Sequence, residues 1–345
     1  MRGIRRVGSL FLLMVISFAG ALSLGEAMVR VFSPEWAPRT GRLTKFWRYD
    51  PIYGWAHVPG QLGEFESYGF RTSVRINSRG YRGPERTYDR RGNARRVVVL
   101  GDSFVWGFGV DESEMFTHRL DRDSGGDFDV VNLGVSGYST DQELLVYRNE
   151  GRRYGADTVV LVVATNDVAM NVSSVAYLIY GKPLFKLVGD SLQVTNQPVP
   201  ETHWAQRLVV DFAGQSYLLN QMNRVRETWT VKRALSEPIA GHPATNQRGA
   251  DRPFLSSQAE RVTVRLIAQL GQEVTADGAQ FLVVLVDGIY GGRSFGAALR
   301  ELGLQVLELD DVIQYEDRSV HLFDGLHWNG VGHEIVARAI APSLL

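Results

Sequence analysis

Short apolar runs alternate with segments of helical periodicity over the last 250 or so residues of the chain. Five runs predict buried strands: 97–100, 128–133, 158–164, 281–286 and 304–309. Helical patterns lie between or after them, at 139–153, 256–277 and 331–341. Strands that are apolar on both faces and alternate with helices are typical of a parallel sheet covered on both sides. The pattern therefore predicts an α/β fold built on a five-stranded parallel sheet.

The N-terminus carries a different pattern, an apolar run at 7–24 preceded by three arginines. The run is long enough to cross most of about 30 Å of hydrocarbon, and basic flanks stay on the cytoplasmic side. A small-x-small sequence at 19–21 also fits a cleavage site, which would make this segment a removable signal peptide. Because apolar residues resume after Glu26, we favour an uncleaved signal-anchor over residues 1–32, with secretion after cleavage as the alternative. Both readings place the rest of the chain outside the cytoplasm, in a periplasmic or extracellular position.

Two segments depart from the alternating rhythm. Residues 33–95, which we call the preface, contain many Gly, Pro, Arg and aromatic residues, and they predict β-ribbon and turns packed on the core domain at 96–345. The arginines between Arg79 and Arg96 are expected to be solvated, with a patch for an anionic surface or substrate as the alternative. Residues 170–255, which we call the insertion, are rich in aromatic and turn residues, and 185–194 predict a β-hairpin. We expect the insertion to lie beside the active-site edge, with a purely structural excursion as the alternative.

Composition excludes several classes of function. The chain has no cysteine, so it has no disulfide, thiol nucleophile or cysteine-based metal site. Lys and Arg total 37 against 38 Asp and Glu, a balance that argues against nucleic acid as a main partner. No cluster of His, Asp and Glu has the spacing of metal ligands, so no metal is expected.

Candidate chemistry begins where the first predicted strand ends, at Gly101-Asp102-Ser103. A serine hydroxyl is a poor nucleophile until a neighbouring base takes its proton. That base is normally an imidazole, which a carboxylate holds in one tautomer. Near the C-terminus the chain reads Asp324-Gly-Leu-His327, which supplies both groups within one turn of chain. The pattern predicts Ser103 as the nucleophile, His327 as the base and Asp324 as the group that orients it.

Donors for an oxyanion follow the next two strands. Backbone amides at glycine and the side-chain amide of Asn suit this task. The loop 132–137 and Asn166 supply these types, and the carboxyl ends of parallel strands meet at one sheet edge. Gly134 is an alternative to Gly137 as the donor in this loop.

Aromatic side chains flank the two catalytic fragments. Trp106, Phe108 and Trp328 are candidates to line the substrate pocket, and packing in the core is an equal alternative for them. His333 has no carboxylate three residues before it, so we expect it to be a surface histidine of the last helix rather than the base.

In these residues the chain resembles the SGNH (GDSL-type) hydrolase family, whose conserved positions lie in four short blocks. The blocks here are 101–104, 132–137, 164–167 and 324–327, and the resemblance covers about residues 97–342. Gly137 and Asn166 match the oxyanion positions of the family. Ala164 stands where the third block usually has Gly, and Phe104 replaces the commoner Leu. The resemblance implies a flavodoxin-like three-layer α/β/α sandwich, hydrolysis or transfer of ester-linked acyl groups, and no cofactor.

The leading hypothesis is a serine esterase that hydrolyses O-acyl esters, acetyl above all, of a carbohydrate or lipid outside the cytoplasm. The first alternative is an O-acyltransferase that uses the same triad on a cell-surface polysaccharide. A second alternative is a catalytically inactive, membrane-tethered glycan-binding protein. The intact set of Ser, Gly, Asn, Asp and His favours an enzyme.

Overall fold

The structure of the chain is a computed structural model, which describes most of the core domain and parts of the remaining segments. The described residues are 2–32, 46–67, 70–90, 92–164, 166–176, 180–189, 191–206, 216–219, 222, 257–286, 294–313, 318–322 and 326–345. Asp324 and much of the insertion lie outside the described residues.

The core is a sheet of five parallel strands, and all five were predicted from the apolar runs. They are β5 (Arg95–Leu100), β6 (Phe128–Asn132), β7 (Thr158–Val163), β12 (Gln280–Leu285) and β13 (Gln305–Glu308). The spatial order is β13-β12-β7-β5-β6. Numbered along the chain, this is the 2-1-3-4-5 order of flavodoxin-like folds read from the other edge. The predicted flavodoxin-like fold is therefore confirmed.

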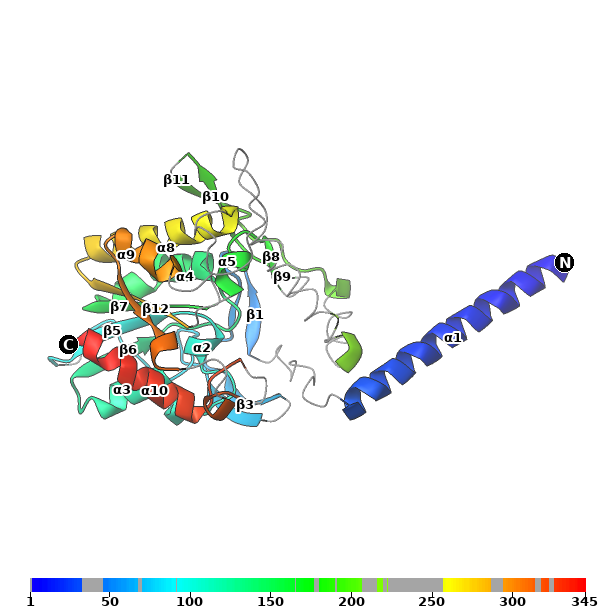
Figure 1. Cartoon of the computed structure of the whole chain (residues 1–345), viewed down its shortest axis with the longest axis horizontal. Coiled ribbons are helices and arrows are strands. Elements are labelled where there is room, and N and C mark those ends of the chain that lie inside the picture. Colours follow the sequence, from blue (N-terminus) through cyan, green and yellow to red (C-terminus); the bar gives the residue numbers. More distant parts are fainter. Residues whose placement is uncertain are drawn as a thin grey trace.

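Helices cover both faces of this sheet (Figure 1). Because side chains alternate along a strand, Val97 and Val99 of β5 pack in one apolar cluster while Val98 and Leu100 pack in another. The first cluster is covered by α3 (Phe116–Asp123) and α10 (Gly330–Ile340). The second is covered by α4 (Thr140–Asn149), α5 (Asn166–Met170), α8 (Gln258–Ala276) and α9 (Ser294–Glu301). The molecule thus has the predicted three layers. Short 3₁₀ turns complete this core: Glu112–Glu114, Gly151–Tyr154, Leu309–Asp311, Arg318–Val320 and Ala341–Leu344.

The described part of the preface forms two antiparallel hairpins. The strands are β1 (Trp47–Asp50) with β2 (Gly54–His57), and β3 (Leu62–Ser67) with β4 (Phe70–Arg75). Phe65 and Val74 of the second hairpin share a buried cluster with Trp106 and Phe108 of the core. The preface therefore packs on the loop that follows β5.

The expectation of a solvated arginine stretch is wrong for Arg82 and Arg96, which are both 1% exposed. Arg82 donates to the carbonyl oxygens of Trp106, Gly107 and Val110, at 3.1, 2.6 and 2.7 Å. Burial lowers the pKa of Arg82 to about 10. A buried charge is tolerated where polar groups surround it, and here those groups are carbonyls of the loop after β5. Arg82 thus fixes this loop from the preface side.

The insertion contains the predicted hairpin, formed by β10 (Leu184–Val188) and β11 (Ser191–Thr195). It is preceded by the short pair β8 (Val175–Ala176) and β9 (Tyr180–Gly181). Lys182, which follows β9, is fully buried and lies 2.5 Å from the carboxylate of Asp141 on α4. Its ammonium also donates to the carbonyl oxygen of Met170 at the end of α5 (2.9 Å). One buried ion pair therefore ties the insertion to two core helices.

Replacing Lys182 with Met is expected to lower the free energy of unfolding by about 3–5 kcal/mol, because Asp141 would stay buried without its counter-charge. The double variant Lys182→Met/Asp141→Leu should recover part of this loss, since it removes both buried charges. Urea unfolding of the three proteins measures the difference. A single variant as stable as the wild type would show that the ion pair does not support the fold.

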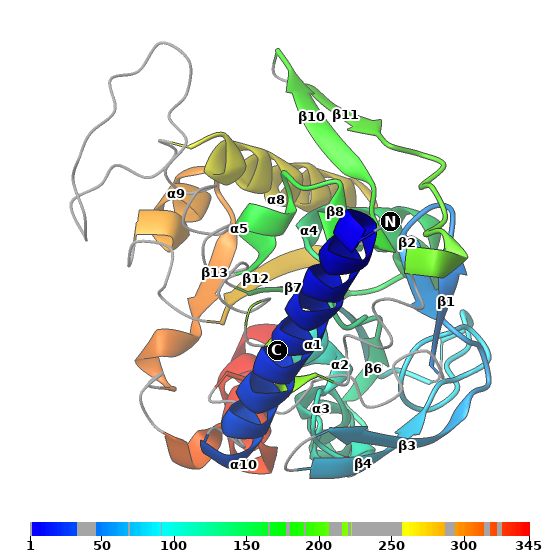
Figure 2. The same cartoon turned by 90° about the vertical axis from the view of Figure 1, so that its right-hand side faces the viewer.

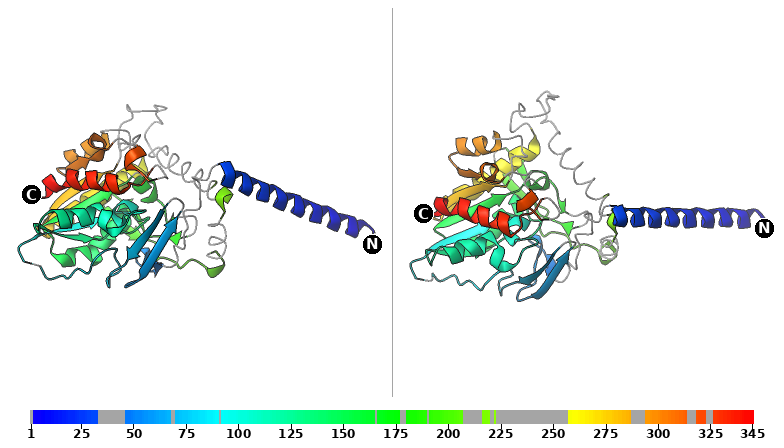
Figure 3. Two further views of the ribbon diagram at one scale, coloured as in Figure 1. Left: turned by 90° about the horizontal axis from the view of Figure 1, so that it is seen from below. Right: turned by 60° about the horizontal axis from the view of Figure 1, so that its bottom comes forward.

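Helix α1 (Arg2–Phe32) projects from the body of the molecule (Figure 3). Its residues Leu12–Phe32 are long and apolar enough to cross a membrane, and none of that stretch is buried in the rest of the chain. Length and composition of this kind also fit a signal sequence near the N-terminus.

Candidate active site

The candidate catalytic residues gather where the strand order reverses. Strand β5 leads through α2 (Ser103–Trp106) to α3 on one face of the sheet, whereas β7 leads to α5 on the other face. In open parallel sheets, ligands bind at the carboxyl ends of strands at this switch point. Ser103 begins α2 and Asn166 begins α5, so both lie at the switch between β5 and β7. Figure 2 views the molecule from this edge.

The turn that presents Ser103 is fixed by its neighbours. The Asp102 carboxylate accepts a hydrogen bond from the Phe104 amide at 3.0 Å and so caps α2. Gly101 has no room for a side chain, because a Cβ there would lie 2.4 Å from Val105. Ser103 stays partly exposed at the end of this turn. The hydroxyl is therefore held in place and open to a substrate.

The structure brings Ser103 and His327 together across 224 residues of chain, with 2.8 Å between the Ser103 Oγ and the His327 Nε2. The imidazole is 6% exposed and packs against the rings of Phe104 and Phe108, with centroids 5.1 and 4.4 Å away. The separation between the Ser103 Oγ and the His327 Nε2 is the one that proton transfer from a serine hydroxyl to a histidine requires. Asp324 lies outside the described residues, and its orienting role stays a prediction.

The two candidate glycines of the loop 132–137 differ in the structure, and the choice of Gly137 as the oxyanion donor stays a prediction. The Gly134 amide donates to the Asn132 side chain at 2.8 Å, so it is already engaged. Gly137 has φ +82, in the left-handed region that glycine adopts readily. The side chain of Asn166 hydrogen-bonds the Asp102 carboxylate, which places it beside Ser103.

Four carboxyl groups are buried close to this edge, a feature that the sequence analysis missed. They belong to Asp102, Asp141, Glu143 and Asp167. Burial raises the pKa of Asp102, and burial together with neighbouring carboxylates raises the pKa of Glu143 and of Asp167 well above the usual range. Asp167 accepts a local hydrogen bond from the Ala164 amide at 3.0 Å. Neither Glu143 oxygen has a hydrogen-bond partner in the described part of the chain. Burial thus disfavours the charged form most strongly at Glu143 and Asp167, whereas Asp141 is paired with the Lys182 ammonium.

The aromatic candidates separate in the structure. Trp106 is completely buried against the preface, which favours packing for this residue. Trp328 is 1% exposed, and the cavity that it borders together with Phe104 and Leu326 measures only about 10 Å³, room for one water molecule. Phe108 contacts the His327 ring. A place for Phe108 and Trp328 in the substrate pocket stays a prediction.

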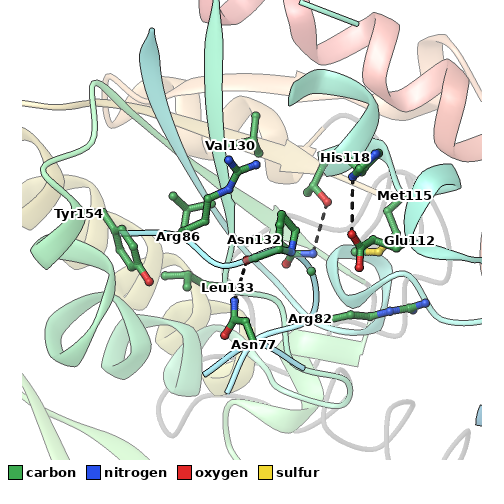
Figure 4. A pocket seen from close by; sticks show the side chains of 14 residues that line it. Asn77, Arg82, Arg86, Glu112, Met115, His118, Val130, Asn132, Leu133 and Tyr154 are labelled. Atoms are coloured by element: carbon green, nitrogen blue, oxygen red, sulfur yellow. Dashed lines mark hydrogen bonds and ion pairs between the residues drawn. The ribbon is translucent and has the colours of Figure 1, made fainter. Parts of the chain in front are cut away.

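A second small cavity, of about 20 Å³, lies between the preface and the core (Figure 4). Its lining includes Arg82 and Arg86 from the preface and Glu112, His118 and Asn132 from the core. None of the described candidate catalytic residues lines it. Across the described residues, no group of three or more His, Asp or Glu side chains is placed to hold a metal ion.

His333 is not the surface histidine that was expected. It is 2% exposed, and its Nδ1 accepts from the Phe116 amide at 3.2 Å. Burial, reinforced by the positive charges of Arg82 and Arg119, lowers the pKa of His333 to about 3. The ring is therefore neutral and structural, and it supports α3 rather than the chemistry at Ser103.

Comparisons with known proteins find similarity in structure but not in sequence. No protein-family model matches the chain, and no curated protein has a matching sequence. A putative lipolytic protein of the G-D-S-L family from Desulfitobacterium hafniense is 11% identical, over 72% of this chain and 99% of that one, with a TM-score of 0.40. TesA is 16% identical over 73% and 100% of the two chains, with a TM-score of 0.41.

A third similar structure is the acetyl xylan esterase AlAXEase, which is 14% identical over 72% of this chain and 100% of that one, with a TM-score of 0.39. The strand order and the placement of the first three blocks at the carboxyl edge of the sheet come from the chain's own structure. That strand order is the flavodoxin-like one that the resemblance to the SGNH (GDSL-type) hydrolases implied.

Proposed function

We propose that the protein is a membrane-anchored serine esterase that hydrolyses O-acyl esters outside the cytoplasm. The observation that carries the proposal is the 2.8 Å contact between the Ser103 Oγ and the His327 Nε2 at the switch point of the sheet. A serine and an imidazole at this distance, with an Asn side chain bonded to the neighbouring Asp102, are groups that acyl transfer needs. The apolar, uncovered helix α1 supports an anchor.

In the proposed reaction, the Ser103 Oγ attacks the carbonyl carbon of the ester while its proton passes to the His327 Nε2. The negative charge that develops on the carbonyl oxygen is bound by the amides of Ser103 and Gly137 and by the Asn166 side chain. An Asn amide has two N–H groups, so Asn166 can bond Asp102 with one and the oxyanion with the other. His327 then protonates the leaving alcohol as the carbon–oxygen bond breaks. Water repeats the sequence and releases the acid, and Asp324 is proposed to orient the imidazole throughout.

Purified full-length protein tests the proposal with a panel of p-nitrophenyl acetate, longer-chain esters and acetylated glycans. The expected result is that at least one class of ester in the panel releases its acid with the wild-type protein and not with a Ser103→Ala preparation. Adding acceptor glycans to the same reactions distinguishes hydrolysis from transfer, because transfer moves the acyl group to the glycan at the expense of free acid. An absence of both products across the panel would favour the non-catalytic alternative.

Asn166→Ala is expected to lower kcat about 10²–10³-fold with little change in KM, because the lost donor acts mainly on the oxyanion of the transition state. Steady-state kinetics on the best ester of the panel measures this split. Asn149→Ala serves as the matched control, since Asn149 is exposed on α4 and bonds Tyr53 instead. An increase in KM with an unchanged kcat would instead show that Asn166 contributes to binding of the ground-state substrate.

A further inference from the structure

The insertion is held by hydrogen bonds to the C-terminal part of helix α1. The Glu26 carboxylate accepts hydrogen bonds from the Ser216 hydroxyl at 2.7 Å and from the amides of Tyr217 and Leu218, both at 2.9 Å. Arg30 pairs with Glu26 at 2.7 Å and lies over the Tyr217 ring, 4.9 Å from its centroid. One carboxylate therefore caps residues 216–219 and holds them against the helix.

The position of these hydrogen bonds along α1 sets how deep the bonded part of the insertion lies in a bilayer. The apolar run at 7–24 ends two residues before Glu26, about 3 Å along a helix axis that rises 1.5 Å per residue, and the wider apolar span Leu12–Phe32 ends six residues after it, about 9 Å away. If that run fills the hydrocarbon, Glu26 and Arg30 reach the headgroup layer, where charged side chains are tolerated. Residues 216–219, which contact Glu26, must then lie at the same level.

Large apolar side chains are exposed at this level. Leu219 is 42% exposed and Met222 is 59% exposed, and Trp204 at the start of the same region is 67% exposed. Figure 1 shows residues 204–206 and 217–219 as short green helical segments on the side of the body that faces α1. Tryptophan favours the membrane–water interface because its ring has an apolar body and one polar N–H.

The same side of the molecule carries the candidate active site. Strand β5 begins beside the C-terminus, where Arg95 donates to the Leu345 carbonyl oxygen, and it runs from there toward Ser103. In Figures 1 and 2 the carboxyl ends of the strands face the side from which α1 projects. A bilayer that holds α1 therefore faces the Ser103 edge.

We propose that Trp204, residues 216–219 and Met222 form an interfacial contact with the lipid bilayer, and that this contact holds the Ser103 edge toward the membrane so that the ester substrate is carried by a membrane lipid. The inference rests on the proposed anchor and esterase activity, and it adds a docking surface and a substrate class to them. Glu26 is a positioning residue in this arrangement, because it acts by holding the insertion at headgroup depth.

The test uses the full-length chain in nanodiscs of phosphatidylcholine and phosphatidylglycerol. Because the chain has no cysteine, Met222→Cys gives one site for an environment-sensitive fluorophore. Leu302→Cys is the matched control, since Leu302 is 53% exposed and directly precedes β13. It therefore lies at the amino-terminal ends of the strands, away from the Ser103 edge. Nitroxide-bearing lipids should quench the label at residue 222 at least about twofold more than the label at residue 302, as insertion to the acyl boundary requires. Glu26→Ala should remove most of this difference.

Equal quenching at residues 222 and 302 would overturn the docking surface, and an intact mass that lacks the residues before Leu22 would overturn the anchor beneath it. The substrate class is tested on the same nanodiscs with a bilayer-borne acetyl ester and with soluble p-nitrophenyl acetate. Glu26→Ala should lower the rate on the bilayer ester relative to the soluble one, and an unchanged ratio would contradict the inference. Failure to hydrolyse either ester would count against the esterase itself and would leave the quenching result to decide the docking surface.

Discussion

Ser103→Ala is expected to lower the turnover number for ester hydrolysis on the order of 10⁴-fold or more, because no other group can form the acyl-enzyme. The fold should survive, since the change removes one oxygen from a partly exposed turn that Asp102 still caps. Initial rates on p-nitrophenyl acetate, with circular dichroism of both proteins, measure activity and fold together. Ser78→Ala is the control, because Ser78 lies in the preface and bonds Glu85. A Ser103→Ala protein that kept the wild-type rate would remove the nucleophile from the account.

His327→Ala is expected to cost about as much as Ser103→Ala, since an unactivated serine hydroxyl is a poor nucleophile at neutral pH. The two side chains act as one unit, so the double variant should be no slower than either single variant. In free-energy terms, the two losses of transition-state stabilisation should be strongly non-additive.

Rates of the two single variants and the double variant on one ester measure this coupling. His118→Ala is the matched control, because His118 is a partly exposed histidine of α3 that pairs with Glu112 and not with Ser103. Losses that multiply in the double variant would show that Ser103 and His327 act independently, contrary to their 2.8 Å contact.

The sheet could be predicted because its strands are buried on both faces and therefore appear as continuous apolar runs. Helices α3 and α9 were not predicted, because each presents few apolar side chains to the core. In α3 the main apolar contacts are Phe116 and Leu120, one helical turn apart, within an otherwise charged sequence. A helix with so narrow an apolar stripe gives a weak periodic signal.

The pairing of Ser103 with His327 could be predicted because the residue types and the strand ends both pointed to it. The buried charges could not, because burial of a charged side chain depends on partners that lie far away in sequence. The terminal nitrogens of Arg82 donate to three carbonyls that are 24 to 28 residues away, and the Lys182 ammonium pairs with a carboxylate 41 residues away. The acidic side chain of Glu143 lies in the first turn of α4, where an exposed acid is the ordinary expectation.

Covalent labelling with a fluorophosphonate tests most directly whether Ser103 is an activated nucleophile. The full-length wild-type protein should gain the mass of one phosphonyl group, and peptide mapping should place that group on Ser103. Ser103→Ala should gain no mass, and His327→Ala should label far more slowly, because the hydroxyl would have lost its base. A wild-type protein that does not react, or an adduct that persists in Ser103→Ala, would contradict the account.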